Sequence, residues 1–263
     1  MRKITIEEQK TIQCQLLQEI ADYCDNDGIR YFLAYGTLIG AIRHNGFIPW
    51  DDDIDIAMPR PDYDKFVHSF NQRNSHARVI ELSINKNYGI PFAKVYDDRT
   101  WVNELHYKHE EYGVFVDIFP IDGIKDTAQF KRANRLNQIL HTKKANFTRR
   151  KLSKMIINFI GKIILLPFSA HDILKLIDKD ARKYAFGSTP KAGLISVPYG
   201  VREMVDTSVF EKTILHEFEG KQYRIPIGYD KWLTSLYGDY MQLPPEDKRK
   251  PHHVLDAWWK DSN

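Results

Sequence analysis

The sequence predicts an α/β (α+β) fold with a mixed sheet at its core and a helical appendage. Helical and strand patterns alternate over the first 125 residues, as they do in proteins whose helices pack on a sheet. Residues 126–190 are mainly helical in pattern, whereas residues 191–263 mix short strands with Gly and Pro. The chain has 263 residues, of which 43% are hydrophobic, and this is enough to build a large core.

The first predicted helix is marked at both ends. Thr5 and Glu8 form a capping box, apolar residues follow at helical spacing, and Gly28 is a stop signal. A buried strand, a turn into a short helix, a second strand and a helix with a proline in its first turn come next. These four elements are expected over residues 31–34, 36–43, 53–58 and 61–70.

Short strands and two more helices are predicted in the rest of the chain. Apolar segments bounded by turn residues predict the strands. They are expected over residues 78–82, 90–96, 100–104 and 113–119. Apolar residues at helical spacing predict the helices, which are expected over residues 129–141 and 172–184.

An acidic run at residues 51–55 carries the main chemical signal. Four of its five residues are aspartates, and Asp53 and Asp55 alternate with isoleucine. On a strand the two carboxylates would point the same way while the isoleucines enter the core. Neighbouring carboxylates repel each other unless a cation lies between them, and hard oxygen ligands suit Mg²⁺, with Mn²⁺ as a substitute. The pattern favours a metal site for phosphorus-group transfer over the alternative, a solvated acidic loop.

A third carboxylate is expected at Asp117, in the apolar run 114–119. A charge there is costly without a partner, so Asp117 is expected to join Asp53 and Asp55 as a catalytic residue and metal ligand. The alternative is a buried ion pair with Lys94 or a nearby arginine.

Several residues are candidates to contact a phosphate. Gly36 and Thr37 occupy a strand-to-helix turn, where glycine permits close approach and the helix N-terminus attracts anions. Arg43, His44 and Lys94 are candidates to bind phosphate oxygens, because arginine offers a bidentate fork and lysine a point charge. The alternatives are surface ion pairs for Arg43 and Lys94, and a loop-fixing role for His44.

The segment YGTLIGAIRHNGFIPWDDDIDIAMPRPDY at residues 35–63 resembles the signature of the LicD family. The likeness continues through residues 92–94, 116–120 and 237–241, and it is weakest at about 125–190. LicD proteins transfer phosphocholine from CDP-choline to sugars of bacterial surface polymers, and fukutin-related protein, which uses CDP-ribitol, is similar.

This resemblance implies a nucleotidyltransferase (polymerase β-like) fold, a CDP-linked donor and a divalent metal bound by Asp53 and Asp55, with Gly36 and Thr37 at the phosphates. Asp117 matches the third carboxylate of the family, and Asp122 is the substitute for it. The expected reaction transfers phosphocholine from CDP-choline to a hydroxyl of a lipid-linked glycan precursor, of teichoic acid or lipopolysaccharide type, and releases CMP. The alternative is another CDP-linked alcohol phosphate, such as ribitol or glycerol phosphate. Residues 1–125 are expected to form the catalytic core, 126–190 a basic helical insertion, and 191–263 the rest of the same domain.

A choline donor also needs an aromatic or acidic pocket for its quaternary ammonium. Aromatic residues and glutamates occur close together in the middle of the chain, and core packing is the alternative role for each aromatic. The candidates are Trp50, Trp101, Tyr107 and Tyr112, with Glu104, Glu110 and Glu111 nearby.

Charge is unevenly distributed along the chain, although the net charge is only +3. Residues 127–171 contain no Asp or Glu but ten Lys or Arg residues, nine of which precede the apolar run 155–168. This order suggests peripheral contact with an anionic membrane, with a core helix and a solvated basic face as the alternative. A nucleic-acid-binding protein is a rival, but we expect no nucleic acid because interleaved aromatics and a known module are missing. Two cysteines without zinc spacing and an N-terminus unlike a signal peptide predict a cytoplasmic protein, peripheral on the inner membrane face.

Overall fold

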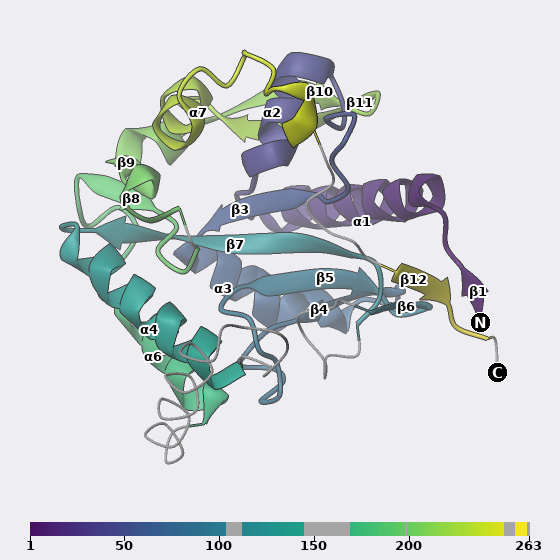
Figure 1. Ribbon diagram of the computed structural model, residues 1–263, viewed down its shortest axis with the longest axis horizontal. Helices are drawn as coiled ribbons and strands as arrows, with labels where there is room; N and C mark the ends of the chain where they lie inside the picture. Colours follow the sequence, from purple (N-terminus) through teal and green to yellow (C-terminus); the bar gives the residue numbers. More distant parts are fainter. Residues whose placement is uncertain (104–111, 145–168, 198, 250–255, 262–263) are drawn as a thin grey trace.

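A mixed seven-stranded sheet is the centre of the molecule (Figure 1). The computed structural model describes residues 1–103, 112–144, 169–197, 199–249 and 256–261. The main path of the sheet is β2-β3-β7-β5-β4, and β8 extends it from β7 and pairs with β9. Only the β3–β7 pair is parallel among the pairs described in this sheet. Its strands are β2 (Phe32–Leu33), β3 (Asp55–Pro59), β4 (Ala77–Ile80), β5 (Ala93–Asp97), β7 (Phe115–Ile124), β8 (Lys191–Gly193) and β9 (Val205–Asp206).

Two smaller sheets flank the main one. A three-stranded sheet joins β1 (Arg2–Lys3), β12 (Asp256–Trp259) and β6 (Thr100–Asn103), so both ends of the chain lie side by side (Figure 1). A hairpin of β10 (Thr213–Phe218) and β11 (Lys221–Pro226) lies near β2 and α2 on another side of the molecule.

Helices cover the sheet and extend beyond one end of it. In Figure 1, α1 and α3 lie behind the main sheet, α4 and α6 pack together at one end, and α2 and α7 lie on the side of the hairpin. The α-helices are α1 (Ile6–Asp27), α2 (Tyr35–His44), α3 (Arg60–Ser69), α4 (Ala128–Lys144), α6 (Ala170–Ala181) and α7 (Tyr229–Tyr237). The described part of the chain also has short 3₁₀ turns, which are η1 (Phe70–Gln72), η2 (Gly200–Glu203), η3 (Thr207–Phe210) and η4 (Glu246–Lys248).

Helix α1 shows how a local signal positions a distant loop. Its predicted capping box is present, since Thr5 accepts from the Glu8 amide and Glu8 accepts from the Thr5 amide. The helix ends at Gly28, whose φ of 63° is easy for glycine. The Gln13 side chain, on the buried face of α1, donates to the Asp52 carbonyl at 3.1 Å. The helix therefore fixes the backbone of the acidic run.

The strand after the acidic run differs from the prediction at its start. β3 begins at Asp55, so Asp53 precedes the ladder and strand alternation does not set the direction of its side chain. β7 is longer than the predicted 113–119, because its second half pairs with β8. The mixed α/β fold class is confirmed.

The predicted membrane-contact segment falls partly outside the described residues. The apolar run 155–168 lies in the part that the structure does not describe. Among the described helices, none has the length and hydrophobicity needed to cross a membrane. Cys14 and Cys24 are both free thiols.

Candidate active site

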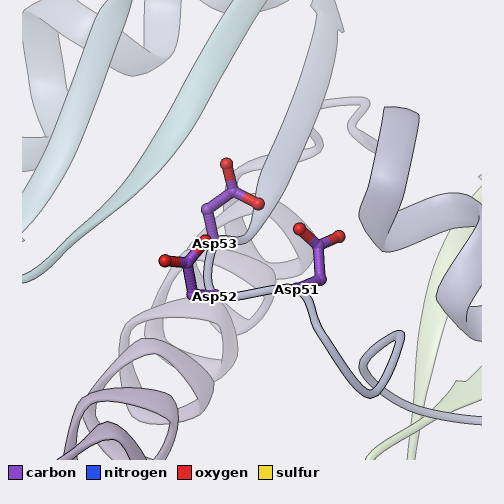
Figure 2. Close-up of side chains that lie close together, drawn as sticks. All are labelled: Asp51, Asp52 and Asp53. Carbon is purple, nitrogen blue, oxygen red and sulfur yellow. The ribbon is translucent and has the colours of Figure 1, made fainter. Parts of the chain in front are cut away.

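Three consecutive aspartates gather in the loop that leads from α2 into β3. Asp51, Asp52 and Asp53 each offer a carboxylate oxygen, and these oxygens lie within 4.8 Å of one another (Figure 2). Asp51 and Asp52 are buried and Asp53 is half-buried. The sequence prediction selected Asp53 but omitted Asp51 and Asp52, although the run of aspartates itself was the available signal.

Two further aspartates enter the site from neighbouring parallel strands. Asp55 opens β3 and Asp117 lies near the start of β7, and the two are register partners. The Asp117 amide donates to the Ile54 carbonyl at 2.9 Å, which locks the two strands at this level. The predicted meeting of Asp55 and Asp117 is therefore confirmed.

The negative charges of the carboxylates at this site repel one another. Burial, the Asp53 carboxylate and a hydrogen bond with Asp53 raise the pKa of Asp51 to about 7. Burial, Asp53, Asp117 and Asp51, in that order, raise the pKa of Asp55 well above its usual range. A cluster of hard oxygen donors with this excess of negative charge suits a divalent cation such as Mg²⁺. These residues therefore fit the metal that the sequence predicts.

Lys94 balances one of these carboxylates. Its Nζ lies 2.6 Å from Asp117 Oδ1, and it packs 3.3 Å from the centre of the Phe115 ring. The alternative that the sequence left open, a buried Lys94–Asp117 ion pair, is what the structure shows. Lys94 is only 2% exposed, so it contacts Asp117 from within the protein interior. Its predicted contact with a donor phosphate stays untested.

Gly36 and Thr37 organise the aspartates at the start of α2. The Thr37 hydroxyl accepts a hydrogen bond from the Asp55 amide at 2.8 Å. A Cβ at Gly36 would collide with Asp51 Oδ2, so only glycine allows the carboxylate to approach the helix this closely. The observed contacts of both residues are with the acidic loop and β3, whereas their predicted contact with phosphates remains a prediction.

Arg43 and His44, at the end of α2, hold the C-terminal loop. Arg43 donates to the Tyr240 carbonyl at 2.6 Å and to His44 Nε2 at 3.0 Å. Burial and the Arg43 charge lower the pKa of His44, which favours the neutral ring that accepts this bond. This supports the loop-fixing alternative for His44, and no described contact tests phosphate binding by either residue.

Asp122, the substitute third carboxylate, has a different partner. Its two oxygens accept from Arg60 Nε and Nη2 at 2.7 and 2.6 Å, and both residues are buried. This bidentate pair joins α3 to the far half of β7. Asp122 is therefore a buried ion-pair residue of the fold, and the role of Asp117 as the third carboxylate stays a prediction.

The aromatic residues predicted for a choline pocket are mostly covered. Arg249 lies over the Trp50 ring at 5.5 Å, Trp101 packs against Trp258 at 5.0 Å, and Tyr112 is 1% exposed. Residues 104–111, which hold Tyr107 and the three glutamates, lie outside the described residues.

A mixed sheet with carboxylates at the start of two parallel strands, next to a Gly-Thr helix start, defines a nucleotidyltransferase-like domain. Residues 28–169 match the family described as LicD/FKTN/FKRP, nucleotidyltransferase domain. The chain belongs to this family. It is 34% identical to the lipopolysaccharide cholinephosphotransferase LicD of Haemophilus influenzae, over 98% of this chain and 99% of that protein.

Two further matches cover shorter parts of the chain. The human ribitol 5-phosphate transferase FKRP is 43% identical over 58 residues, which cover 20% of this chain and 12% of FKRP. An uncharacterised protein of Rickettsia typhi is 36% identical over 127 residues, which cover 43% of this chain and 41% of that protein. The match to LicD thus extends over the whole fold, whereas the match to FKRP is local.

Proposed function

We propose that this protein transfers phosphocholine from CDP-choline to a hydroxyl group of lipopolysaccharide or a similar surface glycan, and releases CMP. The observation that carries the proposal is the 34% identity with a lipopolysaccharide cholinephosphotransferase over nearly the full length of both chains. The cluster around Asp55 supports it, because it supplies the carboxylates that phosphoryl transfer needs to bind a metal.

The cation would be Mg²⁺, with Mn²⁺ as a substitute. Asp53 and Asp55 are the proposed ligands from the sequence, and the structure adds Asp51 as a neighbour of both. Asp117 is the proposed third ligand or, alternatively, the proton acceptor. When bound, such an ion neutralises negative charge on the donor pyrophosphate and on the departing CMP.

The reaction forms one P–O bond and breaks another. The acceptor hydroxyl oxygen bonds to the phosphorus of phosphocholine, and the bond from this phosphorus to the bridging oxygen of CMP breaks, so its electron pair leaves with CMP. The hydroxyl proton passes to a carboxylate. Asp117 is the candidate, because a hydrogen bond of 2.6 Å from Lys94 Nζ to Asp117 Oδ1 holds this carboxylate in position. Gly36 and Thr37 keep Asp51 and Asp55 in place during the step.

A donor panel tests this proposal. The protein is incubated with Mg²⁺, lipopolysaccharide lacking phosphocholine, and either CDP-choline, CDP-ribitol or CDP-glycerol, and CMP release is measured. We expect release from CDP-choline, its loss in Asp53→Asn, and no change in Asp206→Asn, a matched control at the exposed residue of β9. Preference for CDP-ribitol would favour the activity named for FKRP instead. No acceptor-dependent release from any donor would overturn the proposal.

Contact with an anionic membrane is a further part of this proposal, because it would bring the protein to a lipid-linked acceptor. A groove of about 610 Å³ between α4 and α6 supports it. The groove is lined mainly by apolar and basic side chains, with Asp180 paired to Arg132 at 3.0 Å. Apolar and basic side chains together suit the surface of an anionic membrane. The lining residues of the groove are Arg132, Arg135, Leu136, Leu176, Lys179, Asp180 and Lys183.

Sedimentation with vesicles tests this contact. Wild-type protein should sediment with phosphatidylglycerol vesicles at low salt and remain free with phosphatidylcholine vesicles. Arg135→Gln with Lys183→Gln should weaken sedimentation, because each basic residue near such a surface contributes about 1 kcal/mol. Lack of sedimentation at low salt would end the membrane hypothesis, and salt-sensitive binding to RNA in its place would favour the nucleic-acid rival.

A further inference from the structure

Two tyrosines, Tyr199 and Tyr237, form a partly open aromatic corner. Tyr199 precedes η2 and Tyr237 is the last residue of α7, yet their ring centres lie 5.8 Å apart at an interplanar angle of 71°. The two side chains remain 39% and 37% exposed, unlike most aromatic residues of the core. The Tyr237 hydroxyl donates to the Tyr199 hydroxyl at 3.4 Å, and the exposed parts of the two rings form the walls of the corner.

The aromatic corner lies beside the acidic cluster. The Tyr199 ring stacks on Tyr35 at 5.1 Å, and the neighbouring Ala34 amide donates to the Asp55 carbonyl at 3.0 Å. Partial burial raises the pKa of both corner phenols, and the Asp55 charge raises it further in each. The corner therefore lies within the electrostatic field of the carboxylates at the reaction site.

Buried contacts hold the corner in place. The Tyr35 hydroxyl donates to Glu203 Oε1 at 2.7 Å, and the Trp232 indole donates to Glu203 Oε2 at 3.2 Å. Glu203 ends η2, which Tyr199 directly precedes, and Trp232 belongs to α7, which ends at Tyr237. This fully buried carboxyl therefore links the two segments that hold the corner tyrosines. Because the walls are fixed before a ligand arrives, binding does not have to order them.

We propose that Tyr199 and Tyr237 bind the trimethylammonium group of the donor. Electron-rich ring faces attract a quaternary ammonium, and nearby carboxylates strengthen this attraction. Ribitol and glycerol lack a cation and would gain nothing from this arrangement. The inference rests on the proposed function and assigns its choline subsite to residues at 199 and 237, about 90 residues or more from the aromatic candidates selected from sequence.

Donor kinetics with leucine and phenylalanine variants test the inference. Tyr199→Leu and Tyr237→Leu remove one ring face each, whereas Tyr199→Phe and Tyr237→Phe retain it. Tyr229→Leu, at the other end of α7, is the matched control. Each variant is assayed with CDP-choline and with its uncharged analogue, the dimethylbutanol ester in which carbon replaces nitrogen.

We expect each leucine variant to raise the KM for CDP-choline roughly five- to tenfold with little change in kcat. The KM for the uncharged analogue should stay the same, and the phenylalanine and control variants should behave like wild type. An equal loss with both donors would show a packing role and overturn the inference. A rise in the acceptor KM instead would assign the corner to the acceptor sugar.

Direct binding separates this inference from the proposed function. The affinity of wild-type protein and the leucine variants for CDP-choline is measured by calorimetry with Mg²⁺ and without acceptor. If wild-type protein binds CDP-choline and both leucine variants bind it with the same affinity, the choline subsite is overturned while the transferase proposal stands. Absence of both binding and turnover of CDP-choline overturns the transferase proposal and the subsite with it.

Discussion

Replacing Glu203 with glutamine should remove a pH-dependent loss of stability. Glu203 is 0% exposed, and its carboxyl group accepts hydrogen bonds from Tyr35 and Trp232. Burial raises its pKa from 4.5 to about 8, although the bonds from Tyr35, Trp232 and the Leu194 amide act in the opposite direction. The effect of burial is therefore larger than that of three hydrogen bonds.

The sign follows from the protons bound in each state. Between about pH 4.5 and pH 8 the folded protein keeps the Glu203 proton, whereas the unfolded chain has released it. The contribution of Glu203 to the free energy of unfolding therefore falls as the pH rises through this window. At about 1.4 kcal/mol per pH unit, the fall is at most about 5 kcal/mol. Glutamine does not titrate and avoids this loss.

Urea unfolding of wild type and Glu203→Gln, measured from about pH 5 to about pH 9, checks this expectation. The free energy of unfolding of wild type minus that of the variant should fall by roughly 3–5 kcal/mol over that range. Glu211→Gln removes an exposed carboxyl and controls for the change in net charge. A wild-type-minus-variant difference that stays constant within about 0.5 kcal/mol would refute a proton on folded Glu203.

Three further outcomes concern the acidic cluster. Asp55→Asn should lower CMP release at least about 100-fold, because it removes a proposed metal ligand. Its stability in urea should not fall, because burial and nearby carboxylates oppose the charge of Asp55 in the wild type. Activity within about threefold of wild type would exclude Asp55 from the mechanism. Gly36→Ala should raise the Mg²⁺ concentration for half-maximal activity, because its methyl group displaces Asp51; an unchanged Mg²⁺ titration would contradict this. Lys94→Met should destabilise the fold by about 3 kcal/mol, because it removes the cation beside Asp117, and adding Asp117→Asn should restore most of that loss. No recovery in the double variant would assign the loss to packing.

Local patterns allowed most elements and part of the site to be predicted. The capping box at Thr5, the glycine stop at Gly28 and the short helix after residue 34 depend on neighbours within a few positions. The acidic run was also recognisable, because four of the five residues at 51–55 are aspartates. The start of β3 was misplaced by two residues, because the ladder with β2 and β7, rather than the alternation of side chains, decides where pairing begins.

The partner of each charged group depended on contacts between segments far apart in the chain. For the ion-pair alternative at Asp117, the sequence left the partner open between Lys94 and an arginine, and the β5–β7 register placed Lys94 opposite it. Asp122, only five residues further, lies beside Arg60 instead. Periodicity fixes which face a residue occupies, but it does not specify which residue of another strand lies opposite.

The sequence by itself determined the family, the fold class and the acidic motif, because these are encoded by neighbouring residues. The tertiary structure alone brought Tyr35 within 2.7 Å of Glu203, across 168 residues, and set Tyr199 against Tyr237. Their place beside Asp55 results from the packing of α7 and η2 near α2, which buries apolar surface from distant segments. Such packing depends on the whole core, so no short window of sequence can specify it.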